Sequence, residues 1–242
     1  MCAYSQKRVS VWTGPETALL LVTEALTLAR AASKSSVLIL LDLSAAFDTV
    51  NHHILQSTLM KMGFSGTALQ WFKSYLSGRS FRVSWRGEVS KSQLLATGVP
   101  QGSVLGPLLF SIYMLSLGFF IQKHGFSYRY ADDIQLYFSY QPDDPTVAGR
   151  IAACLTDISG WMKDHHLQIN LAKTELLVVS ANSVLHHSLS IQLGSSTITP
   201  SRTARNLGVV MDDHLSFTDH TTTTVRSCRF AFYNIRKIRP FL

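Results

Sequence analysis

Residues 37–42 read VLILLD, which sets five apolar side chains in a row directly before the carboxylate of Asp42. A short, continuous apolar run of this kind predicts a strand that is buried on both faces. Burying an isolated carboxylate is costly, so an acid at this place is expected to be paired, hydrogen-bonded or bound to a metal ion. Asp42 is therefore a candidate functional residue.

Two further acids interrupt the most aromatic part of the chain. Residues 126–138 read FSYRYADDIQLYF, with Asp132 and Asp133 at the centre, and predict two strands around a tight turn. Three carboxylates at neighbouring strand ends would repel one another without a cation, and hard oxygen ligands suit Mg²⁺. Acid pairs are also common in turns, and the chain has others at 143–144 and 212–213. The residues alone leave a metal site and an ordinary turn equally open.

The composition excludes several classes of protein. Of the 242 residues, 46% are hydrophobic and only 15% are charged, against about 25% charged in an average domain. A disordered, highly charged chain is excluded, because this chain has ample apolar surface to bury. Three widely spaced cysteines, in no metal-ligand pattern, exclude a disulfide scaffold. The formal net charge of +7 weakly favours a polyanionic partner.

The order of apolar and polar segments predicts an α+β domain, because strands and helices do not alternate regularly. Helices are expected at 18–32, 51–62, 67–76 and 147–164, and strands at 37–41, 176–180, 191–193 and 207–211. Alternation over 81–85 predicts a half-buried strand. The charge-free stretch 103–121 is long enough to cross a bilayer. Its glycine, proline and serines favour a buried core helix instead.

Three motifs in order resemble one known family. They are LDLSAAFDTV at 41–50, GVPQGSVLGP at 98–107 and YADD at 130–133. Together they resemble the reverse transcriptase domain of a LINE-type retrotransposon, one without long terminal repeats, over nearly the whole chain. The resemblance implies a right-hand polymerase palm, an antiparallel sheet backed by helices, with partial fingers, over residues 1–220. Residues 221–242 would be the start of a truncated thumb.

The resemblance also implies the roles of the site residues. Asp42 and Asp132 would bind two catalytic Mg²⁺ ions, which Mn²⁺ can replace, and Asp133 would be a weaker partner in the same cluster. The ring of Phe47 would lie under the sugar of the incoming nucleotide and exclude a 2′-hydroxyl; by its pattern alone it would be a core aromatic. The nucleotide-binding residues implied in this way are Leu43, Phe47, Pro100, Gln101 and Gly102.

Two later segments complete the resemblance. In NLAKTE at 170–175, Lys173 would donate a proton to the leaving pyrophosphate or screen its charge, and a solvated surface lysine is the equally open alternative. In NLGV at 206–209, Leu207 and Gly208 would form the primer grip, which makes Asp212 and Asp213 turn residues. The adjacent histidine pairs at 52–53, 165–166 and 186–187 do not favour a zinc site, because neighbours on a helix do not share a face.

The implied function is RNA-directed DNA polymerase, which extends a DNA primer on an RNA template with deoxynucleoside triphosphates by two-metal nucleotidyl transfer. The alternative is a catalytically silent retroelement-derived fragment with the same fold and at most weak nucleic-acid binding. A protein anchored in a membrane by residues 103–121 is disfavoured, because the glycine-proline start of that stretch belongs to the nucleotide-side motif. No membrane partner is expected, and the sequence does not indicate an oligomeric state.

The family's upstream finger segments have no counterpart before Trp12, and the resemblance includes no endonuclease domain. We therefore expect an internal piece of a longer element. A nuclear location would suit an element that inserts into a genome, but no basic import cluster marks it, so the sequence leaves the location undetermined.

Overall fold

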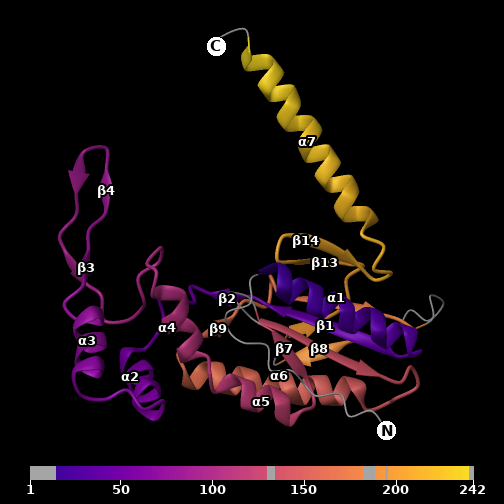
Figure 1. The fold of residues 1–242 in the computed structure, drawn as a ribbon, viewed down its shortest axis with the longest axis horizontal. Helices are drawn as coiled ribbons and strands as arrows, with labels where there is room; N and C mark the ends of the chain where they lie inside the picture. The colour runs from indigo at the N-terminus through magenta and orange to yellow at the C-terminus, as the bar shows by residue number, and fades with distance from the viewer. Residues whose placement is uncertain (1–14, 130–133, 182–188, 194–195, 240–242) are drawn as a thin grey trace. The chain divides into compact units, whose positions relative to one another are not determined.

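The computed structural model describes residues 15–129, 134–181, 189–193 and 196–239 (Figure 1). The chain forms two compact units. The first, called the sheet unit, comprises Met1–Leu41, Phe126–Ala152 and Leu171–Leu242 as far as they are described. The second, called the helical unit, comprises Asp42–Gly125 and Ala153–Asn170.

The sheet unit is built on four antiparallel strands in the order β10-β1-β8-β7. They are β1 (Ser35–Leu41), β7 (Ser127–Arg129), β8 (Ile134–Tyr140) and β10 (Glu175–Val179). Every residue of β1 is buried, as the apolar run at 37–41 predicts for an interior strand. The aromatic segment forms two paired strands as expected, and residues 130–133 between them, where the tight turn is predicted, lie outside the described residues.

Helix α1 (Pro15–Ala31) packs on this sheet and completes its core (Figure 1). Val22 and Leu26 lie one helical turn apart on the same face, so both reach the sheet. They pack with Leu38 of β1 and Leu177 of β10, and all four side chains are fully buried. Burying each of these aliphatic side chains contributes about 1.5–3 kcal/mol. This packing fixes β1 in the middle of the sheet.

Two hairpins and a long helix complete the sheet unit. Strand β11 (Ile191–Leu193) pairs with β12 (Ser196–Ile198), and β13 (Thr203–Asn206) pairs with β14 (Val209–Asp212). The expected strand at 207–211 is wrong in its first two residues. Leu207 and Gly208 have φ values of 47° and 86° and form the turn, since two left-handed residues match the twist of the strands that they join. Helix α7 (Thr218–Ile238) follows and buries none of its side chains.

The helical unit contains α2 (His52–Lys61), α3 (Gly66–Leu76), α4 (Gly106–Tyr113) and α5 (Leu117–Lys123). Helix α2 begins where the sequence predicts, because the Asn51 side chain accepts hydrogen bonds from the main-chain N–H groups of His53 and Ile54, at 2.9 and 3.2 Å. A short ladder joins β2 (Leu43–Ser44) to β9 (Gln168–Ile169).

Helix α6 (Val147–Asp164) runs from the sheet unit into the helical unit. Its expected apolar face is confirmed, because Ile151, Leu155, Ile158 and Met162 are all buried.

The prediction of one helix over 103–121 is wrong. The segment forms α4 and α5, which are bent by 46° at a break. At the break Leu115 and Leu117 donate their N–H groups to the carbonyls of Ile112 and Met114, three residues back. Such bonds tighten the chain and end the α-helical ladder. No single helix in the described part of the chain is long and apolar enough to cross a membrane, and only the bent pair passes by length and composition.

The prediction of a half-buried strand over 81–85 is also wrong. Residues 79–95, called the arm, form a narrow hairpin in which β3 (Ser80–Phe81) pairs with β6 (Gln93–Leu94) and β4 (Ser84–Trp85) pairs with β5 (Glu88–Val89). All four strands are exposed. Alternating residues do give strands, but the described helical unit supplies no second layer to cover them.

Candidate functional site

The ends of β1 and β8 lie side by side where the predicted acidic site begins. Leu41 pairs with Ile134 as the last rung of this antiparallel ladder. In sequence Asp42 directly follows Leu41, and Asp133 directly precedes Ile134. Asp132 and Asp133 lie outside the described residues. Within the described ranges no three His, Cys, Asp or Glu side chains are arranged to hold a metal ion, so the predicted metal site stays a prediction.

The main chain at Asp42 and Leu43 is held by the first residue of the NLAKTE motif and by the short strand β9 before it. The Asp42 carbonyl accepts a hydrogen bond of 2.8 Å from the N–H of Asn170. Leu43, one residue on, is half-buried and lies opposite Ile169 in the β2–β9 ladder. These contacts fix the backbone that carries the Asp42 side chain. Lys173 is exposed and lies in a turn before β10, in the sheet unit.

Two of the three motifs behind the resemblance meet in the helical unit. The Phe47 carbonyl accepts a hydrogen bond from the Val99 N–H, and the Val50 carbonyl accepts one from the Gly98 N–H, both at 2.8 Å. The half-buried Phe47 ring stacks on Phe110 of α4, with the ring centroids 4.9 Å apart. The motif at 41–50 and the motif at 98–107 are therefore joined, and the stack holds the Phe47 ring in one orientation.

Gly98 is needed for this junction. Its φ is +91°, and a Cβ atom added there would lie 2.9 Å from the Asp48 carbonyl oxygen. Only glycine tolerates both conditions. The His52 ring donates from Nε2 to the Gly98 carbonyl at 2.7 Å. Sequence reasoning missed this supporting role, because it considered His52 only as half of a histidine pair, and nothing in the local pattern indicates its distant partner.

Pro100, Gln101 and Gly102 form a turn that is held in place by hydrogen bonds to the Pro100 carbonyl. The Pro100 carbonyl accepts hydrogen bonds from the Ser103 N–H at 3.3 Å and from its hydroxyl at 2.7 Å. A Cβ at Gly106 would lie 2.7 Å from the same carbonyl oxygen, so the helix start also needs glycine. Gly102 has a φ of +76° with open space around its Cα, and Gln101 is exposed. The turn therefore presents Gln101 and a bare stretch of main chain.

The β13–β14 hairpin is anchored to the sheet. Asn206 is 1% exposed, and its amide donates to the Gln135 side-chain oxygen on β8 at 3.4 Å. The Arg205 N–H donates to the Glu175 carboxylate at the start of β10, at 2.7 Å. The turn at Leu207 and Gly208 thus has a fixed relation to the strand that begins directly after Asp133. The sequence places Asn206 in the NLGV motif but does not predict its burial or its contact with Gln135, because the local pattern around these two amides does not show it.

Asp212 is the last residue of β14 and not a turn residue as predicted, whereas Asp213 does lie in the turn that follows. The Asp212 carboxylate, only 6% exposed, accepts hydrogen bonds from the main-chain N–H groups of His214, Ser216 and Phe217 and from the Ser216 hydroxyl, at 2.7–3.0 Å. Burial favours the neutral acid, but these hydrogen bonds outweigh it and hold the pKa of Asp212 below its ordinary value. The carboxylate therefore organises the loop that leads into α7.

Two further titratable side chains, His165 and Cys154, pack within the helical unit. The His165 ring stacks on Trp161 with the ring centroids 3.7 Å apart, and burial lowers its pKa. Burial, helped by nearby Asp157, raises the pKa of the Cys154 thiol to about 12. The Cys154 thiol therefore stays protonated and is not suited to act as a nucleophile, and Nδ1 of His165 is engaged by the Trp161 carbonyl at 2.9 Å. The histidine pair at 186–187 lies outside the described residues.

Comparison with known proteins gives the family. The reverse transcriptase (RNA-dependent DNA polymerase) family matches residues 8–224. The chain is 32% identical over 196 residues to the probable RNA-directed DNA polymerase from transposon BS of Drosophila melanogaster, covering 78% of this chain and 21% of that protein. It is 29% identical over 185 residues to the probable polymerase from transposon X-element of the same species, covering 75% of this chain and 20% of that protein. The RNA-directed DNA polymerase from mobile element jockey of Drosophila funebris is 28% identical over 195 residues, with coverage of 78% and 21%. The chain thus spans about a fifth of the length of these curated relatives.

Solved structures agree on the fold. Apo telomerase from Candida tropicalis aligns over 83% of this chain and 40% of its own, with a TM-score of 0.52 and 14% sequence identity. Telomerase from Candida albicans, in complex with a fragment of telomeric RNA, aligns over 83% and 35%, with the same TM-score and identity. The α+β fold with an antiparallel palm sheet backed by helices is confirmed by these likenesses and by the order of the strands. The curated relatives are RNA-directed DNA polymerases of Drosophila transposons and mobile elements, and the chain itself belongs to the reverse transcriptase (RNA-dependent DNA polymerase) family.

Proposed function

We propose that the chain is the palm and partial fingers of an RNA-directed DNA polymerase, which extends a DNA primer on an RNA template with deoxynucleoside triphosphates. The observation that carries the proposal is the pairing of Leu41 with Ile134 at the ends of β1 and β8. Their direct chain neighbours are Asp42 and Asp133. An antiparallel pair of strands that ends in this way supports a cluster of carboxylates drawn from both strands.

The proposed metal ligands are Asp42, Asp132 and Asp133. Their carboxylate oxygens are the donor type that Mg²⁺ and Mn²⁺ prefer, and the buried β1 and β8 give them a rigid base. Two bound ions would supply charge stabilisation to the attacking 3′-oxygen and the leaving oxygen. The hydrogen bond from Asn170 to the Asp42 carbonyl supports this role by fixing the backbone of one ligand.

The proposed nucleotide pocket is formed by Leu43, Phe47 and the turn of Pro100, Gln101 and Gly102. Phe47 would exclude a 2′-hydroxyl by contact, and its stack on Phe110 supports this role because a gate must be held in place. Exposed Gln101 offers both a hydrogen-bond donor and an acceptor. Exposed Lys173 would supply a proton or positive charge to the leaving pyrophosphate.

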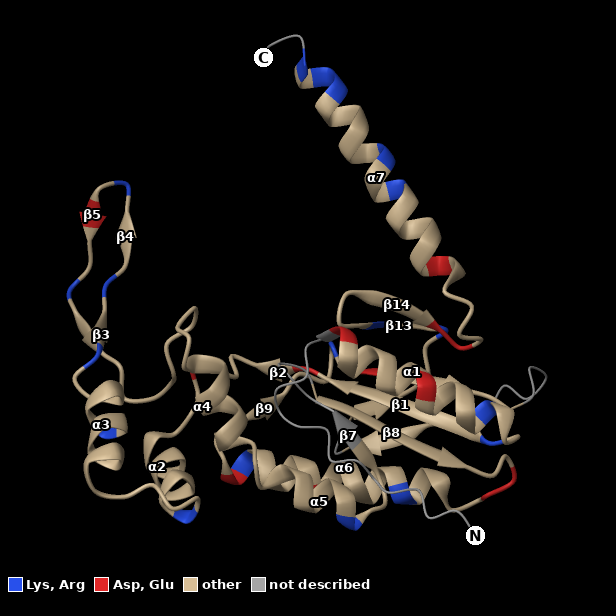
Figure 2. Cartoon of the chain, viewed as in Figure 1, with Lys and Arg blue, Asp and Glu red and all other residues tan. Residues whose placement is uncertain are grey.

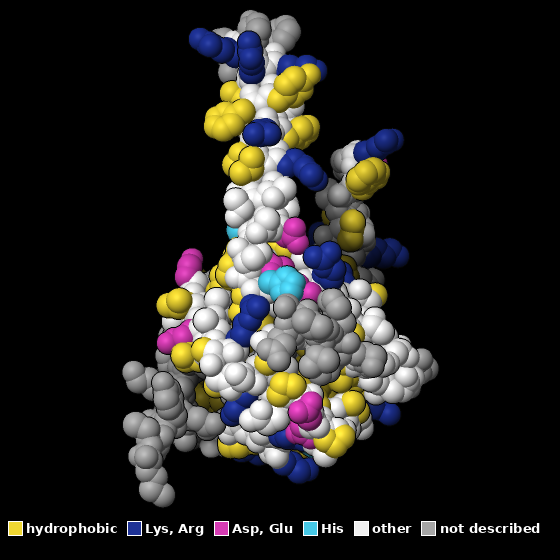
Figure 3. Space-filling model, turned by 90° about the vertical axis from the view of Figure 1, so that its right-hand side faces the viewer, with side chains coloured by type: hydrophobic (Ala, Val, Ile, Leu, Met, Phe, Trp, Pro, Cys, Tyr) yellow, Lys and Arg dark blue, Asp and Glu magenta, His cyan; other side chains and the backbone are white. Residues whose placement is uncertain are grey.

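The proposed contacts to the primer lie in the sheet unit. The Leu207–Gly208 turn would act as the primer grip, because Asn206 and Arg205 hold its strands against β8 and β10. Residues 221–242, most of them in α7, would begin the thumb. In Figure 2 basic residues lie along the far part of this helix, beyond the single acid Asp219, which suits a phosphate backbone. Hydrophobic and basic side chains are interleaved on the far part of α7, whereas its first turns carry mostly threonines (Figure 3).

Primer extension tests the proposal. The chain is mixed with an RNA template, a labelled DNA primer, deoxynucleoside triphosphates and Mg²⁺ or Mn²⁺, and compared with Asp132→Asn. The expected result is extension by the unchanged chain and a loss of about a hundredfold or more in the variant. Asp143→Asn, in the exposed acid pair between two prolines, is the control and should extend normally. Absence of extension by the unchanged, folded chain would instead favour the catalytically silent fragment.

A further inference from the structure

The arm is a hairpin with a defined tip. It follows α3 in the helical unit, and the hydrogen bond from the Leu95 N–H to the Arg79 carbonyl, 2.8 Å long, closes its base (Figure 1). Trp85 lies opposite Glu88. Between them Arg86 and Gly87 have φ values of +51° and +89°, the two left-handed residues of a tight hairpin turn. The tip therefore presents Trp85 and Arg86 in a fixed geometry.

The first strand segment of the arm, residues 80–85, carries an apolar stripe that nothing in the described helical unit covers. Phe81, Val83 and Trp85 alternate along the chain and are 46%, 59% and 72% exposed. A lone two-stranded hairpin is marginally stable in water, and several large apolar side chains are seldom left exposed close together without a partner. The stripe therefore indicates a surface that is covered by a ligand.

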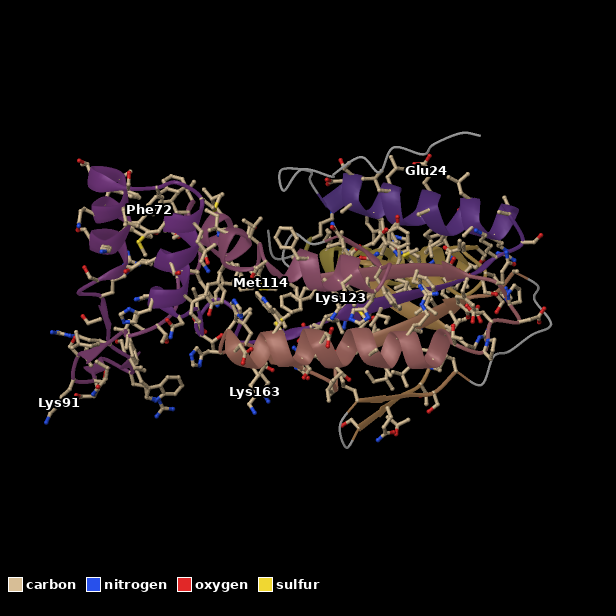
Figure 4. The ribbon with its side chains drawn as sticks, turned by 90° about the horizontal axis from the view of Figure 1, so that it is seen from below. Glu24, Phe72, Lys91, Met114, Lys123 and Lys163 are labelled. Atoms are coloured by element: carbon tan, nitrogen blue, oxygen red, sulfur yellow. The ribbon has the colours of Figure 1, made fainter. Side chains whose placement is uncertain are left out.

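The charges on the arm restrict what that ligand can be. Arg79, Arg82, Arg86 and Lys91 carry four positive charges against the one negative charge of Glu88 (Figure 2). The ion pairs within the described part of the chain use none of these four cations. The side chain of Lys91 points away from the arm into open space (Figure 4). Basic side chains interleaved with aromatic rings complement a polyanion that also carries planar groups able to stack on those rings.

The Arg86 guanidinium lies over one face of the Trp85 ring, 5.7 Å from its centroid, while the tryptophan as a whole is 72% exposed. We infer that the arm binds single-stranded RNA, whose bases stack on Trp85 and Phe81 while Arg82, Arg86 and Lys91 contact its phosphates. Aromatic platforms flanked by basic groups bind single strands in this way without regard to sequence. A protein partner could cover the apolar stripe, but it would not account for the basic set. The identification of the strand as RNA rests on the proposed function, whereas the binding itself needs no catalysis.

The test measures the affinity of the full chain for a fluorescein-labelled, unstructured RNA of about 15 nucleotides by fluorescence anisotropy at several salt concentrations. Trp85→Ala should weaken binding about tenfold, the loss of one stacked base, and leave the salt dependence unchanged. Arg82→Ala with Arg86→Ala should reduce the slope of log affinity against log salt by about 1.4, because each phosphate contact to a single strand contributes about 0.7.

Matched controls remove the same groups elsewhere in the helical unit. Trp71 on α3 is 52% exposed and stacks on Tyr75, so Trp71→Ala deletes an exposed tryptophan outside the arm. Lys61→Ala with Lys163→Ala deletes two exposed positive charges (Figure 4 shows Lys163 on α6). Both controls should bind RNA within about twofold of the unchanged chain, a difference no larger than that of an ordinary surface substitution. Far-UV circular dichroism checks that every variant is folded.

Unchanged affinity in the arm variants, or an equal loss in the controls, would overturn the inference. The outcome is separable from that of primer extension. Loss of RNA affinity in the arm variants, together with no extension by the unchanged chain, would support the arm and contradict the proposed function. Extension by the unchanged chain, together with unaltered RNA affinity in the arm variants, would support the proposed function and contradict RNA binding by the arm.

Discussion

Leu41 of β1 and Ile134 of β8 lie opposite each other in the last antiparallel pair between the two strands. Leu41 is 1% exposed and Ile134 is 2% exposed. Asp42 follows Leu41 in the chain, and Asp133 precedes Ile134. The packing of this buried pair therefore holds the main chain directly next to both acids. A well-packed core transmits small changes in side-chain volume, so this relationship can be tested by truncating the side chains.

Leu41→Ala should lower the free energy of unfolding by about 2–5 kcal/mol, because it removes a buried side chain and leaves a cavity. The milder Ile134→Val should cost about 0.5–1.5 kcal/mol. Urea denaturation followed by circular dichroism measures both values. Leu20→Ala on α1, where the leucine is 65% exposed, is the control, and a cost there as large as at Leu41 would contradict the assignment of the core.

Gly98→Ala should destabilise the chain by more than about 1 kcal/mol, since the new Cβ meets the Asp48 carbonyl and φ is positive. Gly160→Ala is the matched control. A Cβ at Gly160 in α6 meets nothing within 4 Å, so alanine should stabilise the helix by about 0.5–1 kcal/mol. Thermal denaturation measures the Tm of the two variants. A shift of Tm in the same direction for both would contradict the geometry of the junction.

The Asp212 carboxylate gives a dependence of stability on pH. Its folded pKa is lowered below the unfolded value, so its contribution is present above the unfolded pKa of about 3.9. That contribution is lost as pH falls through the folded pKa. Asp212→Asn should cost about 1–3 kcal/mol at pH 7 and should flatten the stability curve below about pH 4. Urea titrations at several pH values measure the free energy of unfolding. If the stability of the variant fell below about pH 4 as steeply as that of the unchanged chain, the role of Asp212 would be contradicted.

The thiols should differ in reactivity. Burial, helped by Asp157, raises the pKa of Cys154 to about 12, so at pH 8 this thiol is neutral and shielded. Cys228 on α7 is exposed. Maleimide labelling of the folded chain, with the sites located by peptide mass spectrometry, should modify Cys228 rapidly and leave Cys154 intact until denaturant is added. Early labelling of Cys154 would contradict the packing of α6.

The sequence predicts this fold well wherever local pattern and burial agree. The apolar run at 37–41 specifies an interior strand, and the periodic face of 147–164 specifies an amphipathic helix, because in both cases one feature determines conformation and environment together. The pattern does not reveal the break at 114–116, which depends on local turn bonds within an apolar stretch. Nor does it reveal the exposure of 81–85, because alternation gives a strand without saying what covers it.

The candidate site, like the fold, could be predicted from the sequence only in part. The motifs predict that Phe47 and Pro100 serve one pocket, and the hydrogen bonds from Gly98 and Val99 do join their segments. The supports of that pocket, such as the contact of His52 with Gly98, are set by tertiary packing between residues 46 positions apart. Short-range patterns carry no information on such pairs, so these supports could only be found in the structure.

We propose that Asp42, Asp132 and Asp133, next to the paired ends of β1 and β8, hold the metal ions for nucleotidyl transfer. The most direct measurement is the rate of primer extension on an RNA template in Mg²⁺ by the unchanged chain, by Asp42→Asn and by Asp143→Asn. The account predicts extension by the unchanged chain and by Asp143→Asn, and a loss of about a hundredfold or more in Asp42→Asn. Extension by Asp42→Asn at the rate of the unchanged chain would contradict it.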